Sequence, residues 1–126
     1  MFGEGNIYGQ SSVTLDSKDR IVLPTFTYAE HEDELLVINK EDYLYVCKEE
    51  KIENIVSNLE QKYIYSNLDE KKQIELELLK IYRAILKKVE VDKQRRLNLG
   101  GIDIQDKKIL CIGAKDSLIL DTKIRN

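Results

Sequence analysis

Hydrophobic and polar residues alternate with a period of two in the N-terminal part of the chain, which predicts short strands. Residues 13–15 and 20–23 form two such segments around a polar turn, and residues 35–39 and 43–47 predict a hairpin. Residues 1–12 contain three glycines and mixed polar residues, so we expect a loose arm that leads into the first strand.

From residue 48 the period changes to about 3.6, which predicts helices. We expect an amphipathic helix over residues 49–63. A second helix should begin after a cap at Ser66 or Asn67, with Asp69 and Glu70 in its first turn. Its expected apolar stripe comprises Ile74, Leu78, Ile81, Tyr82, Ile85 and Val89. No glycine or proline separates this helix from the next segment, so the helical pair should be an insertion rather than a flexible linker.

One polar turn occurs twice, together with the strands beside it. Residues 13–24 are VTLDSKDRIVLP and residues 89–100 are VEVDKQRRLNLG, so Asp16 corresponds to Asp92 and Arg20 to Arg96. The segments that follow, residues 35–47 and 108–121, also correspond and predict a hairpin in each half. The extent of this similarity predicts an internal duplication.

The duplication divides the chain into parts of one compact domain. We expect an arm (1–12), a first β repeat (13–47), a two-helix insertion (48–88) and a second β repeat (89–126). An isolated hairpin is marginal in water, so the two repeats should pair about a pseudo-twofold axis. The predicted fold class is α+β: a small duplicated β-barrel with the two helices packed outside.

In a strand, the side chains of neighbouring residues point to opposite faces. Ile21 and Leu23 should face the core, while Arg20 and Val22 should point away from it. An arginine displayed in this way can contact phosphates or form two hydrogen bonds with guanine. The motif therefore favours nucleic-acid binding, with few contacts from any one subunit.

The charge of the chain is unevenly distributed. The net charge is −3 and the pI is near 5.3, which counts against indiscriminate nucleic-acid binding. Residues 1–50 carry four Lys or Arg against eleven Asp or Glu, whereas residues 87–96 hold five cations against two carboxylates. A polyanion would bind near this second segment.

The remaining reactive residues do not form a familiar catalytic or metal-binding pattern. Cys47 and Cys111 lack a Cys-x-x-Cys partner or a neighbouring histidine, so we expect two reduced, buried thiols and no metal. Asp16 and Asp92 could form a carboxylate pair that shares a proton, but each has a cation within two residues. We therefore expect a protein that is not an enzyme and uses neither a cofactor nor a small-molecule substrate.

The distribution of apolar residues indicates in which cellular compartment we expect the protein. No segment approaches the roughly 20 apolar residues that a membrane-spanning helix needs. The N-terminal residues lack the basic region and apolar run of a secretory signal. We therefore expect a cytoplasmic protein.

Residues 15–25, LDSKDRIVLPT, and residues 89–99, VEVDKQRRLNL, resemble the paired motifs of the MraZ family. That family belongs to the AbrB-like group of swapped-hairpin barrel DNA-binding proteins. Its motif is usually Asp-x-Lys-Gly-Arg, followed by an apolar-apolar-Pro strand. The order of motif, hairpin, two helices, motif and hairpin is also similar, and the resemblance extends over residues 13–121.

The resemblance implies a bacterial transcriptional regulator associated with the nucleoid. Such a protein binds repeated sites in double-stranded DNA, in promoters near cell-division and cell-wall genes. It acts as a homo-oligomer in which the subunits form a ring. Oligomerisation fits the small number of contacts that one subunit offers, since several motifs would have to meet repeated sites.

The resemblance also implies roles for individual residues. The motif Asp, here Asp16 and Asp92, would fix the turn and orient the Arg. The family's DNA-facing Lys is replaced by Gln94 in the second copy, although a cation lies on either side of it. The expected DNA-binding residues are Lys18, Arg20, Lys93, Arg95 and Arg96.

Both copies depart from the family at the motif glycine. Asp19 occupies this position in the first copy and Arg95 in the second. We therefore expect a tight turn with positive φ to be held by residues that carry side chains. Asp19 also places a negative charge beside the expected DNA-binding surface.

Two alternatives remain open at this stage. Each Asp-x-x-x-Arg spacing could serve only as an ion pair that holds its turn, or the Asp could orient an Arg that also meets DNA. The chain could also be an oligomeric protein-interaction module of the same fold. Such a module would bind a protein partner through the acidic first half and an exposed helix face.

Overall fold

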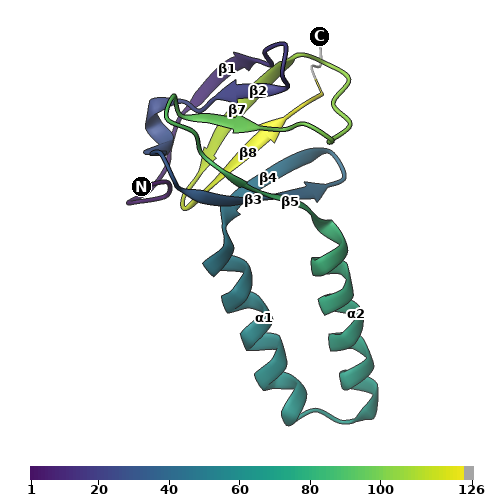
Figure 1. Ribbon diagram of the computed structural model, residues 1–126. Helices are drawn as coiled ribbons and strands as arrows, with labels where there is room; N and C mark the ends of the chain where they lie inside the picture. The colour runs from purple at the N-terminus through teal and green to yellow at the C-terminus, as the bar shows by residue number, and fades with distance from the viewer. Residues whose placement is uncertain (124–126) are drawn as a thin grey trace.

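A computed structural model describes residues 1–123 and shows an α+β fold with both helices between strands (Figure 1). The elements are β1 (Gln10–Thr14), β2 (Arg20–Val22), a short 3-10 helix (Thr25–Thr27), β3 (Glu34–Lys40), β4 (Tyr43–Lys48), α1 (Glu49–Ile64), α2 (Leu68–Ala84), β5 (Ile85–Glu90), β6 (Arg96–Asn98), β7 (Lys108–Ala114) and β8 (Ser117–Asp121). Both predicted hairpins and the first predicted helix are confirmed. Residues 124–126, the last three of the expected second repeat, lie outside the described residues.

The strands form a six-stranded antiparallel sheet in the order β1-β7-β8-β4-β3-β5. The two hairpins meet along β4 and β8, where Leu44 lies opposite Leu120 and Val46 opposite Leu118. Strand β1 of the first half pairs with β7 of the second, and β5 of the second half pairs with β3 of the first. Each half therefore adds a strand to the other half's hairpin, so neither forms a complete sheet alone.

The closed barrel expected from the sequence is not present in the strand pairings of residues 1–123. Strands β1 and β5 are the two edges of the sheet, and no pairing joins them. The short strands β2 and β6 pair with each other in a separate two-stranded sheet. Because β2 and β6 use each other as partners, they do not close the larger sheet.

One hydrophobic core lies between the two sheets. Leu35, Val37 and Val46 contribute to it from the first hairpin, and Leu118 and Leu120 from the second; all are almost fully buried. The core also receives apolar side chains from the segments that contain β2 and β6: Ile21, Leu23, Leu97 and Leu99. The two-stranded sheet is thus fixed to the main sheet by side chains from both repeats.

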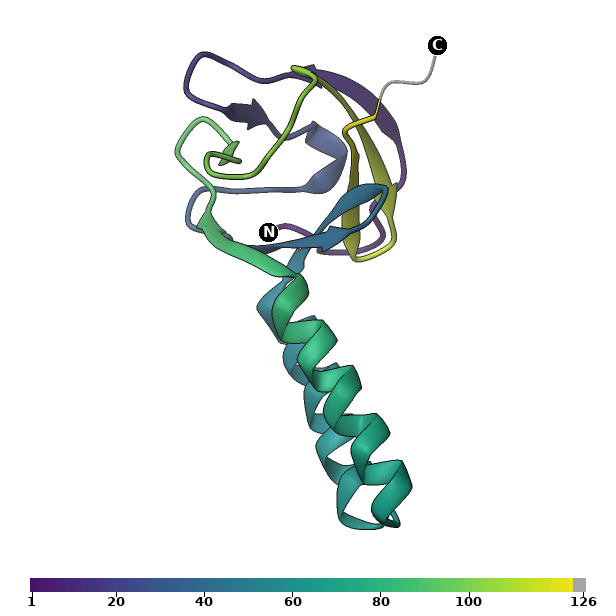
Figure 2. The ribbon, with the colours of Figure 1, turned by 90° about the vertical axis from the view of Figure 1, so that its right-hand side faces the viewer.

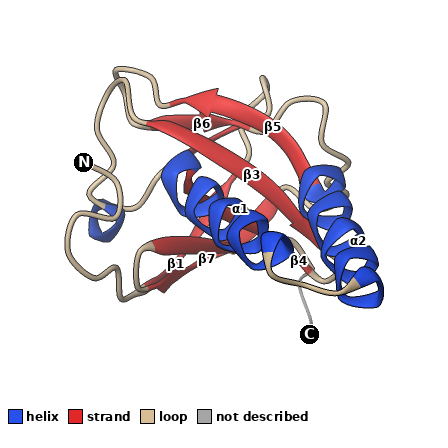
Figure 3. Ribbon diagram, turned by 90° about the horizontal axis from the view of Figure 1, so that it is seen from below, coloured by secondary structure: helices blue, strands red, loops and turns tan. Residues whose placement is uncertain are grey.

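The two helices project from the β structure rather than covering it (Figure 2). Seen from below, they lie side by side beneath the sheet (Figure 3). Helix α1 has no buried residue and α2 buries only Ile74. The expectation that both helices pack against the β structure holds only at their base, where Ile52 and Ala84 contact a small cluster around Leu36 and Cys47. Within residues 1–123, neither helix is long and apolar enough to cross a membrane.

Polar contacts fix the base of the helices to both repeats. Lys51 Nζ, in the first turn of α1, donates to the Tyr45 hydroxyl at 2.6 Å and to Asp116 Oδ1 at 2.8 Å. Lys88 Nζ of β5 lies 2.6 Å from Glu49 Oε2. These contacts hold the helical pair at one end of the β structure.

Helix α2 begins as expected and ends earlier. The Asn67 side chain accepts a hydrogen bond from the Glu70 backbone N–H at 2.9 Å, which confirms the predicted cap. The continuation of the helical stripe to Ile85 and Val89 is wrong, because these residues belong to β5 and pair with Ile38 and Leu35 of β3. Hydrogen bonds to a neighbouring strand replace those of another helical turn.

The expectation of a loose arm over residues 1–12 is also wrong. Phe2 and Ile7 are fully buried in the core, and β1 begins at Gln10. The Phe2 backbone N–H donates to Asp33 Oδ2 at 2.7 Å. The ordered arm also explains the glycine at position 9, because φ there is +149° and a Cβ would come within 2.9 Å of the Phe26 ring.

Candidate nucleic-acid interface

Strands β2 and β6 form an antiparallel pair, here called the motif ribbon, that brings the two copies of the repeated motif together. Ile21 lies opposite Leu97 at its centre, Arg20 opposite Asn98, and Val22 opposite Arg96. Two further backbone hydrogen bonds flank the ribbon, from Leu23 N to Arg95 O and from Leu99 N to Asp19 O, both 2.8 Å. Corresponding residues of the two repeats thus exchange equivalent contacts.

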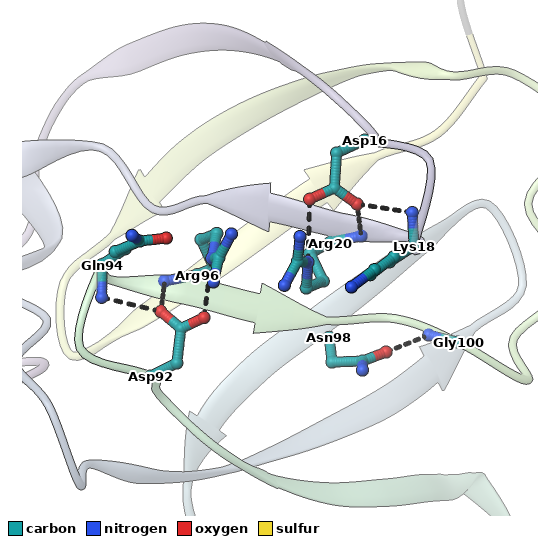
Figure 4. A network of polar contacts seen from close by, with 8 residues as sticks. All are labelled: Asp16, Lys18, Arg20, Asp92, Gln94, Arg96, Asn98 and Gly100. Carbon is teal, nitrogen blue, oxygen red and sulfur yellow. Dashed lines mark hydrogen bonds and ion pairs between the residues drawn. The ribbon is translucent and has the colours of Figure 1, made fainter.

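Asp16 organises the first turn of the ribbon (Figure 4). Its Oδ1 atom accepts hydrogen bonds from the backbone N–H groups of Lys18 at 2.8 Å and Arg20 at 2.9 Å. Its Oδ2 atom accepts from Arg20 Nε at 2.8 Å. One carboxylate therefore fixes both the backbone of the turn and the direction of the Arg20 side chain.

Asp92 makes the same contacts in the second turn. Its Oδ1 atom accepts from the backbone N–H groups of Gln94 at 2.9 Å and Arg96 at 2.8 Å, and its Oδ2 atom accepts from Arg96 Nε at 2.7 Å. The sequence predicts this geometry for both aspartates. It leaves open whether the arginines also meet a ligand.

These contacts lower the pKa of both carboxyl groups. Hydrogen bonding from the Arg20 backbone is the main cause for Asp16, with the Lys18 backbone and the Arg20 side chain adding to it. At Asp92 burial pushes the pKa upward, but the hydrogen bonds from Arg96 and Gln94 together outweigh it. Both aspartates are therefore held in the charged form that binds arginine.

The glycine position of each motif has the backbone conformation expected for it. Asp19 has φ +58° and Arg95 has φ +57°. Each donates its N–H to the carbonyl of the motif aspartate, at 3.1 Å for Asp19 and 3.0 Å for Arg95. Side chains with a Cβ occupy the left-handed region at a cost in free energy, which an arginine bears less well than an aspartate.

The ribbon displays its polar residues on the side away from the core. Ile21 and Leu97 are fully buried beneath it, whereas Val22 is 51% exposed. The side chains of Arg20 and Arg96 are 22% and 25% exposed, respectively. Because these two arginines are diagonal neighbours in the ribbon, their backbones lie roughly 7–8 Å apart. In Figure 4 both arginine side chains lie between the two motif aspartates.

Part of each guanidinium remains available for a ligand. Within residues 1–123, Nε is the only side-chain nitrogen of Arg20 or Arg96 that donates a hydrogen bond to protein. The terminal N–H groups of an arginine can bind a phosphate or a guanine edge while Nε holds a carboxylate. The ion pair and a ligand-binding role are therefore compatible in this geometry.

The other three predicted cations lie in the turns beside the ribbon. Lys18, Lys93 and Arg95 are exposed. With the two ribbon arginines they make five cations against three carboxylates, Asp16, Asp19 and Asp92. The structure thus places all five predicted residues in or beside the motif ribbon, where they outnumber the carboxylates of the two motifs.

Sequence reasoning did not single out Asn98. It lies opposite Arg20 and is exposed. Its Oδ1 atom accepts a hydrogen bond from Gly100 N at 2.8 Å. Alignment of the two repeats could have found it, because Asn98 stands at the outward-facing position of Val22.

The described residues give little support for a carboxylate dyad, a metal site or a reactive thiol. The two motif aspartates are bonded to their own turns on opposite sides of the paired strands, not to each other as a dyad requires (Figure 4). Within residues 1–123, no three His, Cys, Asp or Glu side chains cluster as metal ligands. Burial raises the pKa of Cys47 to about 11 and that of Cys111 to about 12, so both thiols stay protonated near neutral pH.

Among protein-family models and curated proteins, none matches this chain. The evidence for its function therefore lies in the geometry of the motif ribbon and in the sequence motifs themselves.

Proposed function

We propose that this chain is a sequence-specific DNA-binding transcriptional regulator that binds double-stranded DNA through the motif ribbon. The observation that carries the proposal is the pair of arginines, Arg20 and Arg96, each held by its own aspartate on the outer face of a two-stranded ribbon. A rigid display of this kind reduces the entropy lost when an arginine binds a ligand.

The dimensions and chemistry of the ribbon suit the major groove of DNA. That groove admits a two-stranded ribbon, and arginine forms two hydrogen bonds with the N7 and O6 atoms of guanine. In this account Arg20 and Arg96 contact base edges, while Lys18, Lys93 and Arg95 contact phosphates on either side. Phosphate contacts position the protein, and base contacts select the sequence.

We further propose that the β structure is a swapped-hairpin fold of the AbrB-like group, of the MraZ type. The exchange of β1 and β5 between the two hairpins supports this, as does the order of motif, hairpin and two helices. The resemblance suggests repeated promoter sites near cell-division and cell-wall genes as targets. It also suggests a cytoplasmic, nucleoid-associated protein.

Oligomerisation is part of the proposed mechanism. One ribbon with its two turns offers only five cations, and three carboxylates lie among them. Several ribbons bound to closely spaced repeats raise the overall affinity without any new kind of contact, because each later binding event is intramolecular. We therefore propose a homo-oligomer, with a ring as the arrangement suggested by the resemblance.

The test is a binding titration with DNA that carries closely spaced repeats, compared with a scrambled duplex. Arg20→Ala should weaken binding to the repeats by about 1–3 kcal/mol and reduce the preference over the scrambled duplex. The control is Lys62→Ala, which removes an exposed cation from α1 and should leave binding unchanged. Full affinity and preference in the Arg20 variant would remove this arginine from the site.

An oligomeric protein-interaction module of the same fold is the second candidate function. The observation that favours it is the set of exposed apolar side chains on the helices and the turn between them, including Ile64, Tyr65 and Leu68. A folded protein that binds neither duplex, and no genomic DNA fragment, would favour this module over the regulator.

A further inference from the structure

Helix α2 carries apolar side chains on two of its faces. Ile74, Leu78 and Ile81 follow the helical period on the side toward α1, where Ile74 is buried. Leu76 and Leu79 lie on a different face and are 51% and 42% exposed. Exposed leucines on a helix that already has an apolar contact face indicate a second packing surface.

Two cations lie on this second face. By helical periodicity, Lys72 and Arg83 fall within the sector that contains Leu76 and Leu79. Neither cation forms an ion pair with another residue in the described part of the chain. We call these four residues the α2 ridge.

A groove runs between α1 and α2 at their base. Its apolar lining comprises Leu36, Ile52, Val56, Tyr82 and Ile85, and its polar lining comprises Glu49, Glu53, Ser57 and Glu60. The three glutamates all come from α1, and the helical period places them on one side of that helix. We call this feature the acidic groove.

The charges of the acidic groove and the α2 ridge match in sign and spacing. Glu60 follows Glu49 by eleven positions, and Arg83 follows Lys72 by eleven positions. Each pair therefore spans about 16 Å, close to three helical turns. If a second copy's α2 lies antiparallel to α1, its Lys72 comes beside Glu60 and its Arg83 beside Glu53 and Glu49, of which Glu49 already pairs with Lys88 of its own copy. The two leucines then face the apolar lining of the groove.

We propose that the α2 ridge of one copy of this chain docks into the acidic groove of a second copy. The contact is heterologous, because it joins two different surfaces, so each copy can use its ridge and its groove at the same time. Repetition of the contact adds further copies. With the helices antiparallel, the β structures of neighbouring copies lie at the same end of the assembly.

This inference deepens the proposed function, since it supplies a contact that brings several motif ribbons together on repeated DNA. The contact itself involves no ribbon residue. Its test therefore uses no DNA, so failure of the docking contact and failure of DNA binding are distinguishable.

Sedimentation of the purified chain, over a range of concentrations, measures the assembly. The wild type should form species larger than a monomer. A groove variant, Glu53→Lys with Glu60→Lys, and a ridge variant, Lys72→Glu with Arg83→Glu, each place like charges against each other. Each should weaken self-association by about tenfold or more. All four substituted residues are exposed, and circular dichroism verifies the fold of each variant.

Combining the groove variant with the ridge variant gives the decisive result. Mixing them, or combining all four substitutions in one chain, pairs opposite charges again and should restore self-association. A matched control, Lys62→Glu with Glu77→Lys, changes exposed residues on the opposite side of the helical pair and should assemble as the wild type does. A wild type that stays monomeric would overturn the proposal. So would groove and ridge variants that assemble normally, or a four-substitution chain that does not recover.

Discussion

At the scale of single residues, both motif aspartates use their two carboxylate oxygens in the same way. One oxygen receives two backbone N–H groups and the other receives the arginine Nε. The backbone contacts fix the turn, and the side-chain contact fixes the arginine. Because the same carboxylate makes both, its protonation should affect the fold and the displayed arginine together.

Stability should therefore fall in acid in a way that depends on Asp16 and Asp92. Folding lowers the pKa of both groups below the ordinary value of 3.8, so the unfolded chain binds more protons in that range. The stability that they contribute is complete above pH 3.8 and is lost as the pH falls through the folded-state values. Urea unfolding between about pH 2 and 6 measures this dependence.

The control for this prediction carries Asp16→Asn and Asp92→Asn. This variant cannot ionise at either position. Its midpoint of urea unfolding should therefore change less between pH 4 and about pH 2 than the wild-type midpoint does. Equal pH dependence in both proteins would assign the acid sensitivity to other carboxylates.

The left-handed turns give a second prediction at this scale. Arg95→Gly should stabilise the fold by about 0.5–1 kcal/mol, because glycine relieves the cost of φ +57° and part of that gain is offset by the greater entropy of the unfolded chain. Arg95→Ala removes the same charge and keeps the positive φ, so it should give no gain. Thermal unfolding of the three proteins tests this, and equal stability of the glycine and alanine variants would contradict it.

Sequence reasoning was most successful at this residue scale. The fixed spacing of Asp and Arg requires only local geometry, so the turn and the ion pair could be predicted from it. The positive φ of Asp19 and Arg95 was expected from the motif glycine of the family that the sequence resembles. Alignment with Val22 gives Asn98 an outward direction, but that Asn98 lies opposite Arg20 could not be predicted, because this depends on the partner strand. A register between β2 and β6 is a long-range property that neither segment specifies alone.

At the scale of elements, local periodicity predicted the hairpins and helices but not where α2 ends. Ile85 and Val89 fit a helical stripe, since they continue its spacing of three to four residues. They also fit a strand, and pairing with Ile38 and Leu35 of β3 decides between the two. The arm was misjudged for a similar reason, because the burial of Phe2 and Ile7 depends on residues far along the chain.

The helical pair should behave as a unit that is less stable than the β structure. Ile74 is the only buried residue of either helix, so Ile74→Ala should weaken the contact between them by about 2 kcal/mol. Hydrogen exchange should show loss of protection in α1 and α2 with little change in the central strands.

Leu68→Ala is the matched control for this prediction. It removes an equally large side chain from the same helix, but from an exposed position outside the α2 ridge, and should change stability by less than about 0.5 kcal/mol. Equal loss of protection in helices and strands of the Ile74 variant would mean that the molecule unfolds as one cooperative unit.

At the scale of the whole molecule, the duplication explains how a short, acidic chain can present one basic region. Each half contributes a motif, and the exchange of β1 and β5 between hairpins fixes the two motifs beside each other. The sequence predicted two interdependent halves. It did not predict the open sheet, because whether β2 and β6 join the larger sheet or pair separately depends on the final arrangement of all eight strands.

The helices also have a different role at this scale from the one expected. They project from the β structure and leave the ridge leucines of α2 exposed. In the present account this exposure is what allows copies to associate, so that several ribbons meet one DNA molecule. Assembly and DNA binding thus use separate parts of the chain.

The measurement that tests the central claim most directly is a salt-dependent DNA titration of the wild type and of the chain carrying both Arg20→Ala and Arg96→Ala. Particle mass is recorded in the same buffer. The account predicts tight binding to closely spaced repeats by a wild-type oligomer, weakened steeply by salt, and loss of the preference for repeats in the double variant at unchanged mass. Equal binding by both proteins would contradict the account, as would a folded wild-type oligomer that binds neither the repeats nor genomic fragments.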